Sequence, residues 1–129
     1  AVTTVCGTEN TIVIGGDDAN SDYRYGLYRI GEGIVVSPSF YEICAGDCNY
    51  YCFRDDSGRI GMIDRNGNVV LSLAYTDENS TILYMSRSSQ RGYTYLGSTG
   101  YYSIELEDGS KIFIVIDDDG CTYNVITVP

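Results

Sequence analysis

A small set of residues recurs along this chain at a nearly constant spacing. A Gly, two Val and a Tyr match at an offset of 34 residues, namely Gly33, Val35, Val36 and Tyr41 with Gly67, Val69, Val70 and Tyr75. Just upstream, Arg24-Tyr25-Gly26-Leu27-Tyr28 matches Arg59-Ile60-Gly61-Met62-Ile63 at an offset of 35. Weaker copies start at Arg91-Gly92-Tyr93 and at Cys121-Thr122-Tyr123. Matches of this kind predict a fold assembled from repeated units.

The repeated segments consist of short runs of β-branched and aromatic residues, and no stretch shows an apolar stripe at helical spacing. Turn residues that accept a positive φ separate the runs, at Asp56-Ser57-Gly58, Arg65-Asn66-Gly67, Asp108-Gly109 and Asp119-Gly120. The sequence therefore predicts an all-β protein of about a dozen strands. Three or so antiparallel β-meander units would form it, closed as a barrel, arranged as in a propeller, or left as an open repeat array.

The 129 residues suit one domain. We expect a single β-repeat domain over 1–129, with units near 24–58, 59–90 and 91–120. The segments 1–23 and 121–129 would be terminal strands. One meander cannot bury its own face, so neighbouring units must stack or share a sheet.

The unit from Arg59 to Val70 resembles the WG (KWG) repeat family. The resemblance lies in a basic residue, Gly, a short strand, Asn-Gly and Val-Val, read here as Arg59-Ile60-Gly61-Met62-Ile63-Asp64-Arg65-Asn66-Gly67-Asn68-Val69-Val70 with Tyr75 to Glu78 downstream. Tyr25, Ile60 and Arg91 stand where the family has Trp. The resemblance implies a β-rich, largely bacterial structural or binding module, and it transfers no catalytic residue.

Charge and composition exclude several functions. Eighteen Asp and Glu against eight Lys and Arg give a formal net charge of −10, which disfavours binding to nucleic-acid backbones or anionic membranes. The chain has no His, so the commonest general base and metal ligand are missing. The longest strongly apolar run, Ile112 to Ile116, is far too short for a membrane span. We expect no nucleic-acid partner, no membrane span and no cofactor.

The five cysteines are Cys6, Cys44, Cys48, Cys52 and Cys121. The segment around Cys44-x3-Cys48-x3-Cys52 reads as strand, turn, strand, so Cys44 and Cys48 could face each other across the turn. Three thiolates could hold zinc or an iron–sulfur cluster, and a disulfide would fit an exported protein. Small buried side chains with reduced thiols are the favoured reading, without a metal.

Acidic residues cluster at Asp17-Asp18, Asp55-Asp56 and Asp117-Asp118-Asp119. They could bind Ca²⁺ or form a hydrolytic carboxylate pair, but Asp is also the ordinary residue of tight turns. No nucleophile elbow, P-loop or dinucleotide fingerprint is present. We therefore expect no enzyme and no catalytic residue. The arginines in repeat phase, Arg24, Arg59 and Arg91, with Arg54 and Arg87 in the preceding strands, should form cross-strand pairs with acids.

Tyrosine, present 13 times, supplies the binding candidates. Tyr50-Tyr51 and Tyr101-Tyr102 are adjacent in expected strands, so one member of each pair should face outward. Tyr offers contact area and a hydroxyl at recognition surfaces. Plain β propensity, with packing against a neighbouring unit, is the favoured explanation of these tyrosines.

These observations favour a non-catalytic interaction module that binds a protein or a glycan through Tyr50, Tyr51, Tyr101 or Tyr102. The alternative is a small hydrolase with paired Asp or Glu in a cleft between repeats. The sequence begins at Ala1 without Met or an apolar leader, which fits a removed signal peptide or a trimmed chain. A secreted or cell-surface location is favoured over a cytoplasmic one.

Overall fold

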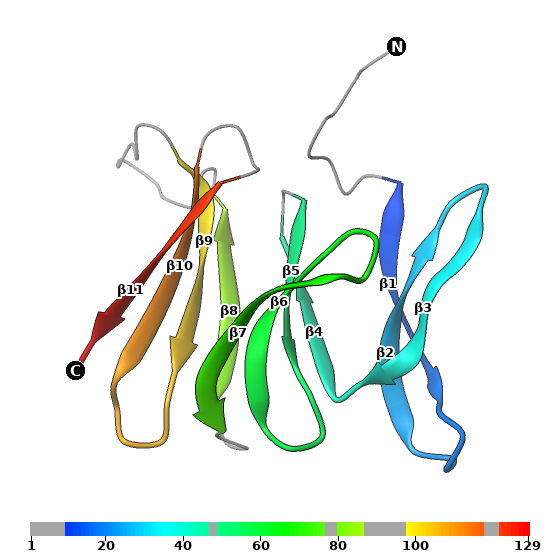
Figure 1. Cartoon of the computed structure of the whole chain (residues 1–129), viewed down its shortest axis with the longest axis horizontal. Helices are drawn as coiled ribbons and strands as arrows, with labels where there is room; N and C mark the ends of the chain where they lie inside the picture. The colour runs from blue at the N-terminus through cyan, green and yellow to red at the C-terminus, as the bar shows by residue number, and fades with distance from the viewer. Residues whose placement is uncertain (1–9, 47–48, 77–79, 87–97, 118–121) are drawn as a thin grey trace. The chain divides into compact units, whose positions relative to one another are not determined.

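The computed structural model describes residues 10–46, 49–76, 80–86, 98–117 and 122–129. Within these residues the chain forms strands and turns and no helix (Figure 1). The strands are β1 (Thr11–Asp17), β2 (Tyr23–Arg29), β3 (Gly33–Phe40), β4 (Glu42–Ala45), β5 (Tyr50–Arg54), β6 (Arg59–Asp64), β7 (Val69–Thr76), β8 (Thr81–Ser86), β9 (Ser98–Glu105), β10 (Lys111–Asp117) and β11 (Tyr123–Val128).

The strands form three antiparallel meanders, in which each strand pairs with its neighbours in the chain. The first sheet has the order β1-β2-β3, the second β4-β5-β6-β7 and the third β8-β9-β10-β11. None of the three sheets closes into a barrel. The all-β, repeated-meander prediction is confirmed. The expected units near 24–58 and 59–90 begin at β2 and at β6. β2 is the second strand of the first sheet and β6 is the third strand of the second sheet, so the expected units do not begin where the sheets begin.

The chain separates into two compact units. The first and second sheets form a two-sheet unit, Thr8–Ala45 with Tyr50–Glu78. The third sheet lies in a single-sheet unit that contains Asn79–Pro129. The weak repeat copies at 91–93 and at Cys121 start in residues outside those that the structure describes.

The core of the two-sheet unit lies between its two sheets. Leu27 of the first sheet packs with Tyr51, Phe53 and Ile63 of the second, and all four are almost fully buried. The Tyr51 hydroxyl donates a hydrogen bond to the carbonyl oxygen of Thr11 at 3.3 Å. Apolar burial between the two meanders is therefore what stabilises the pair, as expected for units that cannot bury a face alone.

The repeated glycines have one structural cause. A Cβ on Gly26 would overlap the carbonyl oxygen of Val36, and a Cβ on Gly61 would overlap that of Leu71. Both glycines lie where the register of the ladder to the next strand shifts. Close approach of two backbones thus explains why Gly recurs at the offset of 35.

The offset of 34 assigned to the third strand of the unit is wrong by one residue. Leu27 pairs with Val36 as Met62 pairs with Leu71, and Tyr28 pairs with Ile34 as Ile63 pairs with Val69. Val35 and Val70 are the two residues left out of these pairings, so Val35 corresponds to Val70 rather than Val69. The connecting turns differ in where they place glycine, with positive φ at Gly31 and Gly33 in the first sheet and at Gly67 in the second.

Four five-residue turns share the same main-chain bonds. In the turn from Asp55 to Arg59, the Asp55 amide donates to the carbonyl of Arg59 and the Gly58 amide donates to the carbonyl of Asp55, both at 3.0 Å. The same two bonds recur in the turns 18–22, 64–68 and 106–110. The fourth residue of each turn has a positive φ, at Ser21, Gly58, Gly67 and Gly109.

Ser21 is the residue at this left-handed position that carries a side chain, with φ of 65°. Left-handed backbone costs a non-glycine residue roughly 1–2 kcal/mol, so Ser21→Gly should raise the free energy of unfolding, by about 0.5–1 kcal/mol after the entropy of glycine is counted. Gly58→Ala, at the equivalent position of the next turn, should lower it by a similar amount. Urea denaturation of the three proteins measures both changes, and equal midpoints would contradict the assignment.

Candidate functional site

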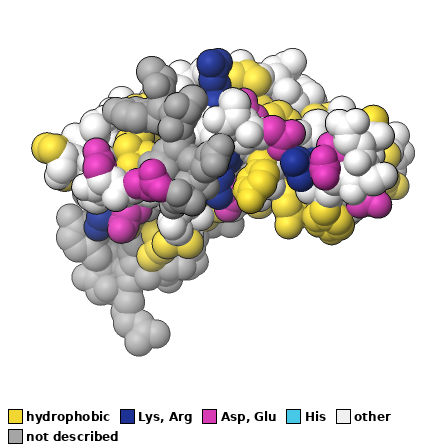
Figure 2. Space-filling view, turned by 90° about the horizontal axis from the view of Figure 1, so that it is seen from below, with side chains coloured by type: hydrophobic (Ala, Val, Ile, Leu, Met, Phe, Trp, Pro, Cys, Tyr) yellow, Lys and Arg dark blue, Asp and Glu magenta, His cyan; other side chains and the backbone are white. Residues whose placement is uncertain are grey.

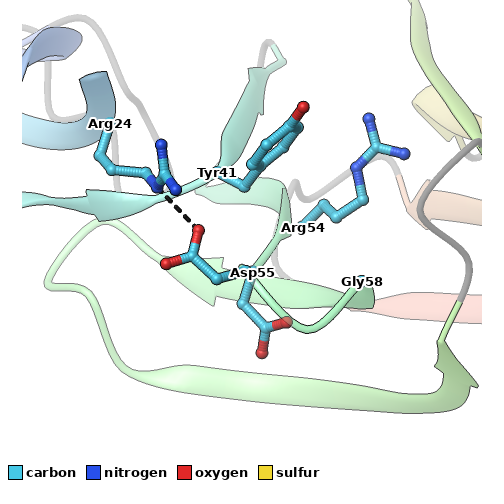
Figure 3. Close-up of a pocket in the computed structure, with 6 residues that line it drawn as sticks. Arg24, Tyr41, Arg54, Asp55 and Gly58 are labelled. Atoms are coloured by element: carbon cyan, nitrogen blue, oxygen red, sulfur yellow. Dashed lines mark hydrogen bonds and ion pairs between the residues drawn. The ribbon is translucent and has the colours of Figure 1, made fainter. Parts of the chain in front are cut away.

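A cavity of about 180 Å³ opens on the two-sheet unit, where the first and second sheets are joined. Its lining residues are Arg24, Tyr41, Arg54, Asp55, Asp56 and Gly58, and we name it the Tyr41 pocket (Figure 3). They come from the start of β2, the corner between β3 and β4, the end of β5 and the turn that follows β5. The volume is smaller than the 300–1,000 Å³ typical of sites for drug-sized ligands, so it suits one small group of a larger ligand.

Tyr41 is the single residue between β3 and β4, and its side chain is 50% exposed. The guanidinium carbons of Arg24 and Arg54 each lie 5.4 Å from the centre of its ring. Figure 3 shows the ring between the two arginines. Each contact is within the range of a cation–π interaction, so the two arginines hold the orientation of Tyr41.

Both arginines are themselves fixed by acids. Nε of Arg24 donates to Oδ1 of Asp56 at 2.7 Å, and Nη1 donates to the carbonyl oxygen of Tyr23 at 2.8 Å. Nη2 of Arg54 donates to Oε1 of Glu42 at 2.7 Å, and these two residues are directly opposite in β4 and β5. The predicted cross-strand pairing of arginine with acid is confirmed for Arg54. Arg87 and Arg91 lie outside the described residues.

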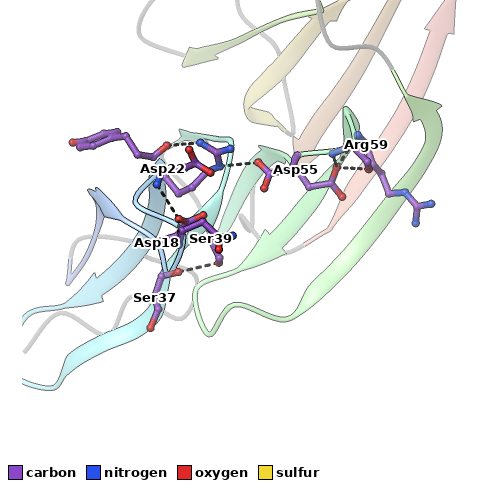
Figure 4. Close-up of polar contacts among 11 residues, drawn as sticks. Asp18, Asp22, Ser37, Ser39, Asp55 and Arg59 are labelled. Atoms are coloured by element: carbon purple, nitrogen blue, oxygen red, sulfur yellow. Dashed lines mark hydrogen bonds and ion pairs between the residues drawn. The ribbon is translucent and has the colours of Figure 1, made fainter.

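Asp55 lines the pocket from the turn between β5 and β6. Its Oδ1 accepts hydrogen bonds from the Ser57 hydroxyl at 2.7 Å and from the Ser57 and Arg59 amides at 3.0 and 2.9 Å (Figure 4). Burial raises the pKa of Asp55, but these hydrogen bonds outweigh it and leave the pKa below its ordinary value. Asp55 is therefore ionised at neutral pH, and its Oδ1 is engaged in hydrogen bonds within its own turn.

Because the pKa of Asp55 is lower in the folded than in the unfolded protein, its stabilising effect is present above about pH 4 and is lost as the pH falls through the folded value. The pKa of Asp18 is lowered in the same way, by the amides of Asp22 and Asn20. We expect stability to decline below about pH 4. Asp55→Ala should lower neutral-pH stability by about 1 kcal/mol and reduce the acid-dependent loss. Urea midpoints measured from neutral to acid pH test this, with Asp22→Ala as the control, and an unchanged acid slope in Asp55→Ala would contradict it.

The charges of the Tyr41 pocket nearly cancel. The guanidinium groups of Arg24 and Arg54 face the carboxylates of Asp56 and Glu42, and Asp55 adds one further negative charge. Such a site does not attract an anion by charge alone. It offers fixed polar groups and one half-exposed aromatic ring, which are the means to orient a small polar group.

The predicted binding tyrosines lie elsewhere. Tyr51 is 1% exposed in the core between the two sheets, and Tyr102 is 0% exposed and packs on Tyr84 with ring centres 4.9 Å apart. Tyr50 and Tyr101 are partly buried, and Tyr101 contacts Phe113 edge to face at 5.9 Å. Of the four, Tyr50 and Tyr101 are the two that a partner could touch.

Sequence reasoning missed Tyr41 as a site residue. One signal pointed to it: Tyr41 directly precedes Glu42, the acid that holds Arg54. Its match with Tyr75 is not such a signal, because the strand pairing follows the offset of 35, at which Tyr41 corresponds to Thr76. What the sequence does not show is that Arg24 and Arg54, from two different sheets, reach the same ring.

Cys44 and Cys52 are directly opposite in β4 and β5, and both are free thiols. Burial, and then the nearby Glu42 carboxylate, raises the pKa of Cys44, and burial likewise raises the pKa of Cys52. Cys48, which we expected to face Cys44, lies outside the described residues, as do Cys6 and Cys121. Among the described residues no three Cys, Asp or Glu side chains are grouped as metal ligands would be.

Within the described part of the chain, no helix has the length and apolar character needed to cross a membrane. Comparisons of this chain with protein-family models, with curated proteins and with solved structures found no match.

Proposed function

We propose that this protein is a non-catalytic interaction module and that the Tyr41 pocket binds a hydroxyl-bearing group, in the first place one sugar residue of a glycan. The observation that carries the proposal is the half-exposed Tyr41 ring held between Arg24 and Arg54, each of which is already neutralised by an acid. A module of this kind agrees with the protein-or-glycan function expected from the sequence, with Tyr41 in place of Tyr50 and Tyr101 as the main contact.

Preorganisation supports a binding role. Binding ordinarily costs side-chain entropy for each group that must be immobilised. Arg24, Tyr41 and Arg54 are already held by ion pairs and ring contacts, so little of that cost remains. An arginine carries five N–H donors, and the described residues accept two hydrogen bonds from Arg24, which leaves donors for ligand hydroxyls.

Local neutrality supports an uncharged ligand. A phosphate or carboxylate would compete with Asp56 and Glu42 for the guanidinium groups and would meet a protein of net charge −10. Sugar hydroxyls donate and accept hydrogen bonds without adding charge. Charged groups fixed in pairs, next to an aromatic ring, therefore favour a glycan over an anion.

The pocket gives less support to a hydrolase with paired carboxylates. Such an enzyme needs one carboxyl group that stays protonated near neutral pH, which requires a raised pKa. Asp55 has a lowered pKa, and Asp56 is bound to Arg24 at 2.7 Å. The resemblance of Arg59 to Val70 to the WG repeats points in the same direction as the binding module, and that family assignment stays a prediction.

A glycan array probed with wild type and with Tyr41→Ala tests the proposal. We expect wild type to retain a defined set of glycans and Tyr41→Ala to lose at least tenfold in affinity for them. Tyr23→Ala is the matched control, because Tyr23 is 59% exposed on the same unit and does not line the pocket. Tyr41→Phe separates the contribution of the hydroxyl from that of the ring.

Two results would contradict the proposal. One is glycan binding that Tyr41→Ala leaves unchanged. The other is an array on which wild type retains no glycan while a pull-down captures a protein partner equally well with wild type and Tyr41→Ala.

A further inference from the structure

The packing of the second sheet on the first provides a template for covering a meander face. In the second sheet, Ile63 pairs with Tyr51 on one side and with Val69 on the other. Ile63 and Tyr51 are almost fully buried, whereas Val69, at the end of this row, is 57% exposed. Ile63 and Tyr51 face the first sheet and contact the cluster around Leu27. The first sheet contributes the row in which Leu27 pairs with Val13 and Val36.

The first sheet carries the equivalent of the Ile63 row on its other face. Tyr28 corresponds to Ile63 at the offset of 35, and it pairs with Ile12 on one side and Ile34 on the other. These three side chains form the first-sheet row. Ile12 is 47% exposed, Tyr28 is 36% exposed and Ile34 is 61% exposed. Ile12 and Tyr28 occupy the positions of Tyr51 and Ile63, which the second sheet buries, and on the first sheet both are apolar and exposed. Ile34 corresponds to Val69, which is exposed on the second sheet as well.

The third sheet carries the equivalent of the Leu27 row. The turn 106–110 has the main-chain bonds of the turn 55–59, so Phe113 of β10 corresponds to Met62 of β6, and Met62 to Leu27. Phe113 pairs with Ser103 and Ile126, and Ser103 pairs with Leu83. We name Leu83, Phe113 and Ile126 the third-sheet row. Leu83 is 56% and Ile126 is 48% exposed.

We infer that two copies of this protein associate head to tail, with the third-sheet row of one copy packed on the first-sheet row of the next. The chain presents both halves of the sheet-to-sheet contact that it already makes between its first and second sheets. Both rows consist of uncharged, apolar side chains. Figure 2, which shows one face of the molecule, illustrates that hydrophobic side chains reach the surface between charged ones. The association is independent of the Tyr41 pocket.

Two physical consequences follow. The two faces differ, so the contact is heterologous and each copy keeps one unused face, which allows chains longer than a dimer. Each copy carries a net charge of −10, so the copies repel at low ionic strength. Added salt screens that repulsion and strengthens apolar contacts, and we expect the association to increase with salt.

Sedimentation velocity over a concentration series, at low and at high salt, tests the inference. Wild type should show a mass that rises with concentration and with salt. Ile12→Arg in the first-sheet row and Ile126→Arg in the third-sheet row should each remain monomeric, even though each brings the net charge closer to zero. Ile12 is chosen because it occupies the position of the buried Tyr51. Ile30→Arg and Val125→Arg are the matched controls, because both are exposed neighbours outside the two rows, and both should associate as wild type does.

The decisive sample is an equimolar mixture of Ile12→Arg and Ile126→Arg. The first variant retains an intact third-sheet row and the second an intact first-sheet row, so the mixture should double in mass and go no further. Recovery in the mixture also shows that both variants are folded. Three results would overturn the inference: wild type that is monomeric at every concentration and salt, control variants that lose association equally, or a mixture that stays monomeric while wild type associates.

Discussion

Replacement of Gly61 by alanine should lower the free energy of unfolding by about 3 kcal/mol, near the upper end of what overpacking costs. The new Cβ would overlap the carbonyl oxygen of Leu71 and lie 2.9 Å from two ring atoms of Phe53. Neither neighbour can move easily, because Leu71 belongs to the ladder with Met62 and Phe53 is almost fully buried. Gly26→Ala, which meets the carbonyl of Val36, should cost a similar amount.

Urea denaturation measures this effect, and Gly31→Ala is its control. Gly31 has a positive φ of 87°, but the space that a methyl group would occupy there is open, so alanine meets only the conformational penalty of roughly 1–2 kcal/mol. A Gly61→Ala protein no less stable than Gly31→Ala would show that the close approach of β6 and β7 is not what selects glycine.

Truncation of Tyr51 should be the most damaging change in the core. Removing a buried aromatic side chain costs about 3–5 kcal/mol, and Tyr51 is 1% exposed between the two sheets. Tyr51→Ala should therefore unfold much of the protein at ordinary temperature. Tyr51→Phe keeps the ring and loses the 3.3 Å hydrogen bond to Thr11, so it should cost only about 1 kcal/mol.

Thermal unfolding followed by circular dichroism separates these two variants. The exposed Tyr23→Ala should unfold close to wild type. A Tyr51→Ala protein as stable as wild type would contradict the placement of Tyr51 in the core. The same data are a control for the binding experiments, because any loss of binding in Tyr51→Ala would reflect unfolding rather than a missing contact.

The meander architecture could be predicted from sequence because its causes are local. The turns at Asp55 to Arg59 and Asp64 to Asn68 are defined by an Asp acceptor and a glycine with positive φ, and both signals are visible in the residues themselves. The recurrence of Gly26 as Gly61 was visible for the same reason. The one-residue error at Val35 arose because the offset of 34 aligns more identical residues, including both valines, whereas the strand pairing follows the offset of 35.

The candidate site was harder to predict because its causes are not local. Alternation along a strand says that Tyr50 and Tyr51 point to opposite faces, but it does not say which face another sheet will cover. Tyr41 gains its role from Arg24 and Arg54, which lie on different sheets and meet at one ring only after the sheets have packed. A contact of that kind follows from tertiary packing and leaves no signature in the spacing of residues along the sequence.

The binding role of the Tyr41 pocket is tested most directly by titrating isotopically labelled protein with glucose, galactose, mannose and N-acetylglucosamine while recording nitrogen–proton correlation spectra. The Nε–H groups of Arg24 and Arg54 and the amide of Tyr41 report on the pocket. The account predicts that at least one of these sugars shifts those signals in a saturable manner and that Tyr41→Ala abolishes the response. Spectra that none of the four sugars changes, or shifts centred on Tyr50 or Tyr101 with the Tyr41 pocket unaffected, would contradict it.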